Sequence, residues 1–444
     1  MPSQGTIGDR VRGLRLNRRM SQAQLAGPDL SDSYVSLIES GKRTPTPVVA
    51  RLLAERLGCT TEFLLHGIEP RQRIDTELGL RHAELELRHG DPNVAAERFT
   101  EIIKAAGEEN AMLAAHARLG RARALEAQGR LGPAVEAYER LRREAAAHPE
   151  RLADLPLAVA LARCYHLAGD RLRARDLGTA AFEHATRLAV TQGELAVELA
   201  AALVETRSDP SPELTYVRQV LVSTGTPEIV DRSAEIHALW KASIVAAAGE
   251  DSALAVRLAD DAIAAGRSAR LAVRLGQVSM AWARLGLATA AEAEEFATNA
   301  SRILSAFADT VADHAESMIV HGRVRLRAGD ADGASELGTN ALSLLRNVPG
   351  TVPAVAHLLL ADATLASGGD ATEHLRSARL LLDALHAPPY GIDRRAARCW
   401  RELGDLYGRA GHQDEQTAAY RRALEAAGVR SAMAGVRVDA PLSR

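Results

Sequence analysis

Aromatic residues are scarce in this chain of 444 residues: phenylalanine, tryptophan and tyrosine together account for only 3%. Hydrophobic residues still make up 47%, so any core must be built mainly from alanine, leucine and valine. Because β-strands favour β-branched and aromatic side chains, this composition favours closely packed helices over a β-sandwich. The chain is also too long for one small core, and its length is typical of roughly two to four domains.

Cysteine is rare as well, and the chain has no long apolar run. Cys59, Cys164 and Cys399 are far apart and odd in number, so they provide neither a disulfide framework nor the spacing of a zinc site. We interpret them as buried thiols in a reducing compartment. No apolar segment of the signal-peptide kind opens the chain, and even LAVELAAALV is interrupted by Glu198. These absences predict a cytoplasmic protein that makes no contact with a membrane.

The sequence also lacks the short motifs that mark common catalytic sites. There is no HExxH, no phosphate-binding GxxxxGKS or GxxxxGKT, no GxSxG, and no GxGxxG after a strand. His314 and His321 lie seven residues apart and could share one helix face, but no acidic or cysteine partner accompanies them. A metal site there is therefore much the weaker interpretation. We expect neither an enzyme nor a protein that holds a cofactor or a metal ion.

Charge is unevenly distributed along the chain. The net charge is −3, yet residues 1–66 contain nine lysines and arginines against six acidic residues. The rest of the chain is consequently acidic overall. A basic N-terminal part on an acidic body indicates a contact with nucleic acid that is confined to one end.

Residues 20–47, MSQAQLAGPDLSDSYVSLIESGKRTPTP, have the pattern of two short helices joined by a tight turn. A serine is a suitable N-cap for each helix, Ser21 for the first and Ser31 for the second. A glycine ends each of them, Gly27 and Gly41 respectively. This spacing predicts a helix-turn-helix, whose second helix can lie in the major groove of DNA.

Three further helices are predicted to complete a five-helix unit. The first covers residues 7–19, the fourth opens at Pro47 and ends at Gly58, and the fifth covers residues 60–65. The polar face of the first helix carries five arginines, which form either an ordinary solvated face or, for some of them, contacts with phosphate. They are Arg10, Arg12, Arg15, Arg18 and Arg19.

From Ile74 to about Gly428 the chain is predicted to be almost unbroken helix, interrupted at intervals of about forty residues. Each break falls between two helices, which predicts about nine helical hairpins. The spacing in the last hairpin is similar to the tetratricopeptide signature, on Trp400, Leu403, Gly404, Tyr407, Gly411, Tyr420 and Ala423. Stacked hairpins of this kind form a concave binding surface held by contacts between neighbours.

The segment SQAQLA followed by SYVSLIESGKRTP resembles the DNA-binding head of Cro/phage-repressor regulators of the xenobiotic-response-element type. With the repeats, the whole chain is similar to pheromone-responsive regulators that join such a head to a tetratricopeptide sensor. The resemblance implies an all-α fold, with a five-helix repressor-like helix-turn-helix domain followed by a right-handed tetratricopeptide-type α-solenoid. We expect the helix-turn-helix domain over residues 1–67, a linker over 68–73, the repeat domain over 74–428 and a flexible tail over 429–444.

Alignment with the family pattern, backwards from Gly41, implies how the head meets DNA. The residues expected to read base edges are Asp32, Ser33, Tyr34 and Leu37. The residues expected to contact phosphates are Gln22, Ser36, Lys42, Arg43 and Arg19. The alternative is a five-helix unit that serves only as a dimer platform, which the polar row and its basic flank disfavour.

Three arginines of the repeat body, Arg123, Arg163 and Arg323, each follow the small residue of a repeat. They are predicted to line the inner groove, where they would suit an acidic or C-terminal carboxylate ligand. It is at least as consistent with the sequence that they pair with neighbouring acids such as Glu126 or Glu316. The resemblance implies a homodimer through the body and a peptide ligand, and a small molecule or a protein are the other candidate ligands.

The sequence therefore predicts a DNA-binding transcriptional regulator that is nucleoid-associated when bound to its operator. That operator is expected to be double-stranded DNA with palindromic or paired half-sites. The alternative is a cytoplasmic interaction scaffold or adaptor whose head binds DNA weakly or is vestigial.

Overall fold

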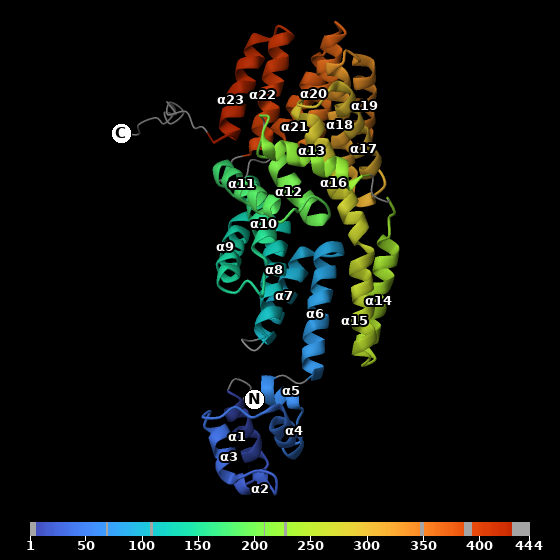
Figure 1. Ribbon diagram of the computed structural model, residues 1–444. Coiled ribbons are helices and arrows are strands. Elements are labelled where there is room, and N and C mark those ends of the chain that lie inside the picture. The colour runs from blue at the N-terminus through green and yellow to red at the C-terminus, as the bar shows by residue number, and fades with distance from the viewer. Residues whose placement is uncertain are drawn as a thin grey trace, which may run out of the picture. The chain divides into compact units, whose positions relative to one another are not determined.

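The computed structural model describes residues 6–67, 70–106, 110–207, 209–225, 229–346, 350–385 and 393–428. Every regular element in these ranges is a helix (Figure 1), which confirms the all-α fold class. The expected tail over residues 429–444, and residues 68 and 69 of the expected linker, lie outside the described residues. None of the helices in the described ranges has the length and hydropathy needed to cross a lipid bilayer.

Residues 6–67, the described N-terminal part, contain five helices, as the sequence predicts. They are α1 (Ile7–Asn17), α2 (Gln22–Ala26), α3 (Asp32–Glu39), α4 (Pro47–Arg56) and α5 (Thr61–His66). Each follows a serine or threonine whose side chain accepts a hydrogen bond from the backbone N–H of the third helical residue. Such caps satisfy donors that a helix cannot satisfy internally, so the sequence could locate these starts. The end of α1 lies two residues before the predicted end at Arg19.

One buried hydrophobic cluster holds these five helices together. Each helix contributes at least one large side chain to it, namely Val11, Leu25, Val35, Ile38, Leu53 and Leu64. All six are fully buried. The helix that follows the tight turn, α3, is therefore fixed by its apolar face, and its other face is left for contacts outside the domain.

By their internal contacts, the residues form two compact units. The first unit comprises the chain up to Asp154 together with Ser233–Ala265. The second comprises Leu155–Arg232 and the chain from Gly266 onward. The first unit is thus discontinuous in sequence, which the regular spacing of the hairpins did not predict.

In its described residues, the first unit adds six helices to the five at the N-terminus. They are α6 (Pro70–His89), α7 (Pro92–Ala106), α8 (Ala111–Ala127), α9 (Leu131–Ala147), α14 (Ser233–Ala248) and α15 (Ser252–Ala265). The hairpin of α14 and α15 packs against α6, where Leu78 and Leu85 share a buried cluster with Ile236. Arg81 Nε also lies 2.6 Å from Asp260 Oδ1, across 179 residues of sequence. Hairpins that are neighbours in sequence are therefore not the only neighbours in this unit.

The second unit contains the other hairpins. Its α-helices are α10 (Asp154–Ala168), α11 (Arg171–Arg187), α12 (Glu194–Val204), α13 (Pro212–Thr224), α16 (Arg267–Leu285), α17 (Ala290–Leu304), α18 (Val311–Arg327), α19 (Ala331–Leu344), α20 (Val352–Ala366), α21 (Thr372–Asp383), α22 (Arg394–Arg409) and α23 (Gln413–Ala426). A short 3-10 helix, η1 (Ala308–Thr310), precedes α18. The first helices of successive hairpins contact one another, α16 with α18, α18 with α20, and α20 with α22, whereas α12 contacts α16 although the α14–α15 hairpin lies between them in sequence. This is the stacking expected of helical repeats.

The last hairpin explains why its signature needs a small residue. Gly404 on α22 faces the ring of Tyr420 on α23, and a Cβ atom at position 404 would lie only 2.6 Å from that ring. Trp400, Leu403 and Tyr407 are buried beside it. The glycine therefore lets α22 and α23 approach closely. The larger side chains around it fill the remaining space between the helices.

Candidate nucleic-acid interface

The two faces of α3 differ in burial. Val35 and Ile38 are fully buried in the core of the head. The outward residues, Asp32, Ser33 and Ser36, are exposed. On the same helix, Leu37 remains 38% exposed and Tyr34 is half-buried. The structure thus brings the predicted base-reading residues onto one helix, with polar groups accessible from outside.

A buried ion pair fixes α3 to α1. Arg15 donates two hydrogen bonds to Glu39, from Nε to Oε1 at 2.6 Å and from Nη2 to Oε2 at 2.9 Å. Only 11% of the arginine side chain and 5% of the glutamate side chain are exposed. Arg15 Nη1 also donates to the carbonyl oxygen of Met20 at 2.8 Å. The two-point contact therefore sets both the distance and the rotation of α3 relative to α1.

The same contact keeps both groups charged. Burial acts to raise the pKa of Glu39, but hydrogen bonds from Arg15 and Gln22 and the charge of Arg15 outweigh it, so the pKa lies below its usual value. The hydrogen bond to Glu39 raises the pKa of Arg15. The carboxylate at the end of α3 thus belongs to the scaffold of the head, and the exposed residues of that helix remain for recognition.

Gln22, a predicted phosphate contact, takes part in this scaffold. Its side-chain Nε2 donates to Glu39 Oε2 at 2.8 Å, and the residue is half-buried at the start of α2. A phosphate contact by Gln22 would use its second amide hydrogen or its backbone N–H. The sequence indicated the position of this residue but not its bond to a glutamate 17 residues away.

The basic loop after α3 lies beside the recognition face. Lys42 and Arg43 are exposed, and their backbone N–H groups donate to the carbonyl oxygen of Leu37 at 2.9 and 3.2 Å. The guanidinium of Arg43 lies 4.9 Å from the centre of the Tyr34 ring. A cation over an aromatic face is attracted to it, so this contact holds Arg43 next to α3. Tyr34, a predicted base contact, and Arg43, a predicted phosphate contact, are thus adjacent.

The expectation of one solvated arginine face on α1 is wrong for Arg10 and Arg15. Arg10 is 8% exposed and donates to the backbone oxygens of Leu64 and Leu65 at 3.1 and 2.7 Å, at the end of α5. Arg15 pairs with Glu39 as described above. The other three, Arg12, Arg18 and Arg19, are exposed, and Arg18 also donates to the backbone oxygen of Gly58 at 3.3 Å. The sequence did contain a signal for the burial of Arg15. It lies four residues after Val11, and residues four apart share one face of a helix, here the buried face of α1.

Two structural residues of the head were missed in the sequence. A Cβ atom at Gly8 would lie 2.3 Å from the backbone oxygen of Ile38, so the backbones of α1 and α3 approach each other directly. Arg56 donates to the carbonyl oxygens of Leu25 and Ala26, at the C-terminus of α2. Through these contacts, Gly8 allows the close approach of α1 to α3, and Arg56 holds the C-terminus of α2. Neither belongs to a motif that the sequence alone assigns to this role.

The three arginines expected in the inner groove are divided between the two units. Arg123 is exposed and belongs to the first unit, whereas Arg163 and Arg323 belong to the second. Arg163 Nη1 donates to Glu198 Oε2 at 2.5 Å, and Arg323 Nη2 donates to Glu402 Oε1 at 2.5 Å. Arg163 and Arg323 are thus paired with acids, although their partners differ from the expected Glu126 and Glu316.

These pairs are part of a polar network in the second unit. It joins helices that each come first in their hairpin. Glu198 also accepts two hydrogen bonds from Arg274, each of 3.0 Å. Glu316 accepts from Arg284 at 2.8 Å and from Arg395 at 2.6 Å. Carboxylates shared between two arginines join helices that belong to different hairpins.

The two histidines considered for a metal site have other surroundings. His321 Nε2 lies 2.7 Å from Glu294 Oε1 on α17, and burial lowers the pKa of His314. Within the described ranges, no group of three or more histidine, cysteine, aspartate or glutamate side chains is arranged to hold a metal ion.

Comparison with known proteins identifies the N-terminal part. A family model described as helix-turn-helix matches residues 11–64, which include α2, α3 and the basic loop. The chain therefore carries an N-terminal helix-turn-helix DNA-binding domain, of the Cro/C1 type expected from the sequence, followed by a body of helical repeats. No curated protein sequence matches the chain.

Several solved structures are similar over most of the chain. A Rap protein in complex with competence and sporulation factor is 12% identical, with 94% of this chain and 98% of that chain covered and a TM-score of 0.43. The apo quorum sensor NprR from B. thuringiensis is 13% identical, with coverage of 79% and 98% and a TM-score of 0.33. PlcR from Bacillus thuringiensis, in complex with the peptide PapR7 and DNA, is 9% identical, with coverage of 94% and 99% and a TM-score of 0.23.

Proposed function

We propose that this protein is a sequence-specific DNA-binding transcriptional regulator whose repeat body dimerises and responds to a ligand. The observation that carries the proposal is the exposed polar face of α3, held by the Arg15–Glu39 contact and flanked by Lys42 and Arg43. We assign the DNA-binding domain to residues 1–67 and the repeat domain to residues 74–428. The regulator acts in the cytoplasm, at the nucleoid.

The division of roles in the head follows from what each side chain can recognise. Asp32 can accept a hydrogen bond from the amino group of cytosine, and Leu37 can contact a thymine methyl group. Ser33 and Tyr34 lie on the same face and complete the base-reading set. Phosphates carry no sequence information, and contacts to them set register. We assign the phosphate contacts to Gln22, Ser36, Lys42, Arg43 and Arg19.

Dimerisation is proposed because one head is too small to select a site in a genome. Helix-turn-helix proteins commonly bind paired half-sites about 34 Å apart, one turn of DNA. A symmetric protein then recognises a symmetric operator. Light scattering on the full chain, alone and with operator DNA, tests this: a monomer at micromolar concentration in both states would contradict it.

The DNA-binding proposal is tested by selecting duplexes from a random library on the full-length protein. We expect an enriched motif with two related half-sites. The combined variant Asp32→Ala, Ser33→Ala and Leu37→Ala should fold and dimerise but lose that motif. If the wild type enriches no sequence and binds all duplexes alike, the scaffold or adaptor alternative holds instead.

The ligand proposal concerns Arg123, Arg163 and Arg323, of which the last two belong to the polar network of the second unit. A peptide, small molecule or protein with a carboxylate could replace Glu198 or Glu402 as partner of Arg163 or Arg323, and so shift one helix against another. Coupling of this kind typically changes affinity by about 1–3 kcal/mol. The test compares DNA affinity with and without cell extract, in the wild type and in a variant with alanine at Arg123, Arg163 and Arg323. If extract modulates both proteins equally, these arginines are structural.

A further inference from the structure

The turn between α10 and α11 meets the start of α22, although these elements are far apart in sequence. Gly169 in this turn has φ of 90°, and a Cβ atom built on it would lie 3.2 Å from Arg394 Cζ. The guanidinium of Arg394 therefore packs directly against the turn. Both residues belong to the second unit, and neither takes part in the arginine–carboxylate pairs described above.

Three arginines gather where these elements meet. Arg171 lies two residues after Gly169, at the first position of α11. Arg398 lies about one helical turn after Arg394 on α22. Arg171, Arg394 and Arg398 are exposed, and among the described residues their side chains form no hydrogen bond or ion pair. Cationic groups thus converge at this place without counter-charges of their own.

A half-buried histidine, His166 at the end of α10, lies beside these arginines. Its Nδ1 atom is buried and has no hydrogen-bond partner in the described part of the chain, whereas Nε2 lies 3.8 Å from Glu205 Oε2. Burial lowers the pKa of His166, and the charge of Glu205 acts to raise it. The charges of the same three arginines lower this pKa further. All three guanidiniums therefore lie close enough to act on one imidazole.

The acidic residues closest in sequence are already engaged. Asp170 accepts a hydrogen bond from the backbone N–H of Arg173 at 3.1 Å and lies 3.5 Å from its Nε. Asp393 accepts from the backbone N–H of Ala396 at 2.9 Å, at the start of α22. Glu205 remains as the acid beside the imidazole, and 46% of its side chain is exposed. Because exposed ion pairs are weak, an anion of higher charge can replace this carboxylate.

We propose that Arg171, Arg394, Arg398 and His166 bind the phosphate groups of a small molecule that carries two or three phosphates in a row. Each guanidinium can donate two parallel N–H groups to phosphate oxygens. Three such forks supply about six donors, more than the roughly four lone-pair sites of one carboxylate. They also carry three positive charges, whereas a single phosphate group supplies only about 1.5–2 negative charges. A chain of phosphates satisfies both requirements.

The arrangement of the cations favours a small ligand over a nucleic acid. Proteins that follow a nucleic-acid strand use a basic groove that tracks the backbone. Here the cations surround one imidazole instead. A bound polyphosphate joins the α10–α11 turn to α22 and so favours the arrangement of the second unit in which they meet. The site uses no residue of the head and none of Arg123, Arg163 and Arg323, so it stands or fails separately from the proposed function.

The test is isothermal titration calorimetry of the full-length protein with sodium tripolyphosphate. We expect saturable binding that weakens at higher salt. The variant Arg171→Gln, Arg394→Gln and Arg398→Gln should bind at least tenfold more weakly. The matched control, Arg187→Gln, Arg257→Gln and Arg346→Gln, removes the same charge at exposed positions elsewhere and should bind within twofold of the wild type. Equal affinities of the two triple variants would overturn the proposal.

Two further arms decide which anion the cluster recognises. Citrate carries three carboxylates and no phosphate, and it should bind at least tenfold more weakly than tripolyphosphate. Equal binding of the two would identify a general anion surface and contradict the proposal.

The second arm measures binding of a DNA duplex by fluorescence anisotropy. The wild type and the variant that lacks the three clustered arginines should bind the duplex within twofold of each other. A loss as large as the loss for tripolyphosphate would assign these arginines to DNA and overturn the proposal. If circular dichroism shows that this variant fails to fold, Arg398→Gln alone replaces it, and unchanged affinity for tripolyphosphate is then equally contradictory.

Discussion

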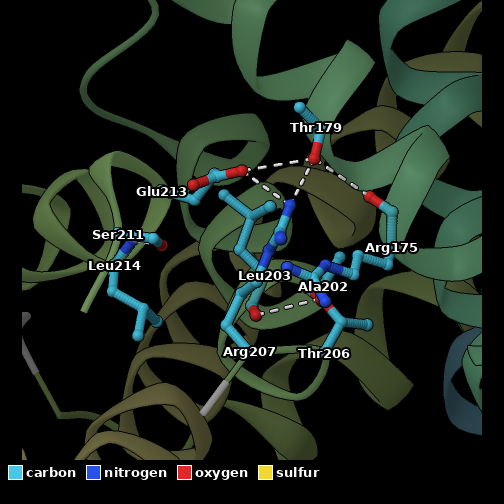
Figure 2. Close-up of polar contacts among 9 residues, drawn as sticks. All are labelled: Arg175, Thr179, Ala202, Leu203, Thr206, Arg207, Ser211, Glu213 and Leu214. Atoms are coloured by element: carbon cyan, nitrogen blue, oxygen red, sulfur yellow. Dashed lines mark hydrogen bonds and ion pairs between the residues drawn. The ribbon is translucent and has the colours of Figure 1, made fainter. Parts of the chain in front are cut away.

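Arg207 and Glu213 form an ion pair of 2.6 Å in which only 9% of each side chain is exposed. The arginine lies in the loop after α12, and the glutamate lies in the first turn of α13. Figure 2 shows Thr179 of α11 beside both, with its hydroxyl donating to Glu213 Oε1 at 3.2 Å. A loop and two helices of the second unit thus meet at one buried carboxylate.

The first prediction concerns this pair. Glu213→Gln keeps the shape of the side chain but leaves the Arg207 charge buried without its counter-charge. We expect the free energy of unfolding to fall by about 3–5 kcal/mol, as measured by urea denaturation followed by circular dichroism. Glu136→Gln is the control, because its pair with Arg140 is mostly exposed and its removal should cost about 1 kcal/mol or less. Similar losses in the two variants would contradict the structural role of the Arg207–Glu213 pair.

The second prediction compares two glycines of α1. Gly8→Ala places a Cβ atom against the backbone oxygen of Ile38, so either α1 or α3 must move. We expect at least a tenfold loss of operator affinity and a lower melting temperature. Gly13→Ala meets no atom within 4 Å and should stabilise the helix by roughly 0.5–1 kcal/mol. Equal behaviour of the two variants would show that the close approach of α1 and α3 is unimportant.

The third prediction is a pH dependence that arises from Glu39. Because the pKa of Glu39 is lowered in the folded protein, its stabilising contribution is complete above the pKa of the unfolded chain and is lost as the pH falls through the folded pKa. Glu39→Gln should therefore be less stable than the wild type at pH 7. The difference should begin to close below about pH 4.3, the ordinary pKa of glutamate. Urea denaturation of both proteins across this range measures it, and a constant difference would argue against a charged Glu39.

The fourth prediction separates the two kinds of DNA contact. Arg43→Ala should weaken binding to all duplexes alike and reduce the salt dependence of the affinity by about one charge. Ser33→Ala should instead change the preference at one base position by roughly 1–3 kcal/mol. Titration of operator variants at several salt concentrations distinguishes them. A uniform loss in both proteins would mean that α3 does not lie in the major groove as proposed.

Local signals explain why much of the head could be predicted. Ser21 and Ser31 cap helices through hydrogen bonds that need only residues three positions away, and Gly41 adopts a left-handed backbone conformation with φ of 70°. Such features depend on short segments, which a sequence displays directly. The helix-turn-helix and its exposed residues were predictable on the same basis.

The burial of Arg15 could not be read so directly. Arginine is usually exposed, and its buried position here depends on Glu39, which is 24 residues away and belongs to another helix. Arg163 presents the same difficulty, because Glu198 is 35 residues away. Long-range pairing requires the packed structure, and a single sequence does not specify which acid meets which arginine.

The packing of α15 against α6 has a consequence for the growing chain. At about 5–20 residues per second, synthesis of the 179 residues between Arg81 and Asp260 takes roughly 10–40 seconds. During that interval Leu78 and Leu85 lack the cover that α14 and α15 later provide, while α10 to α13 are being synthesised. The first unit consequently finishes folding only after part of the second has been made.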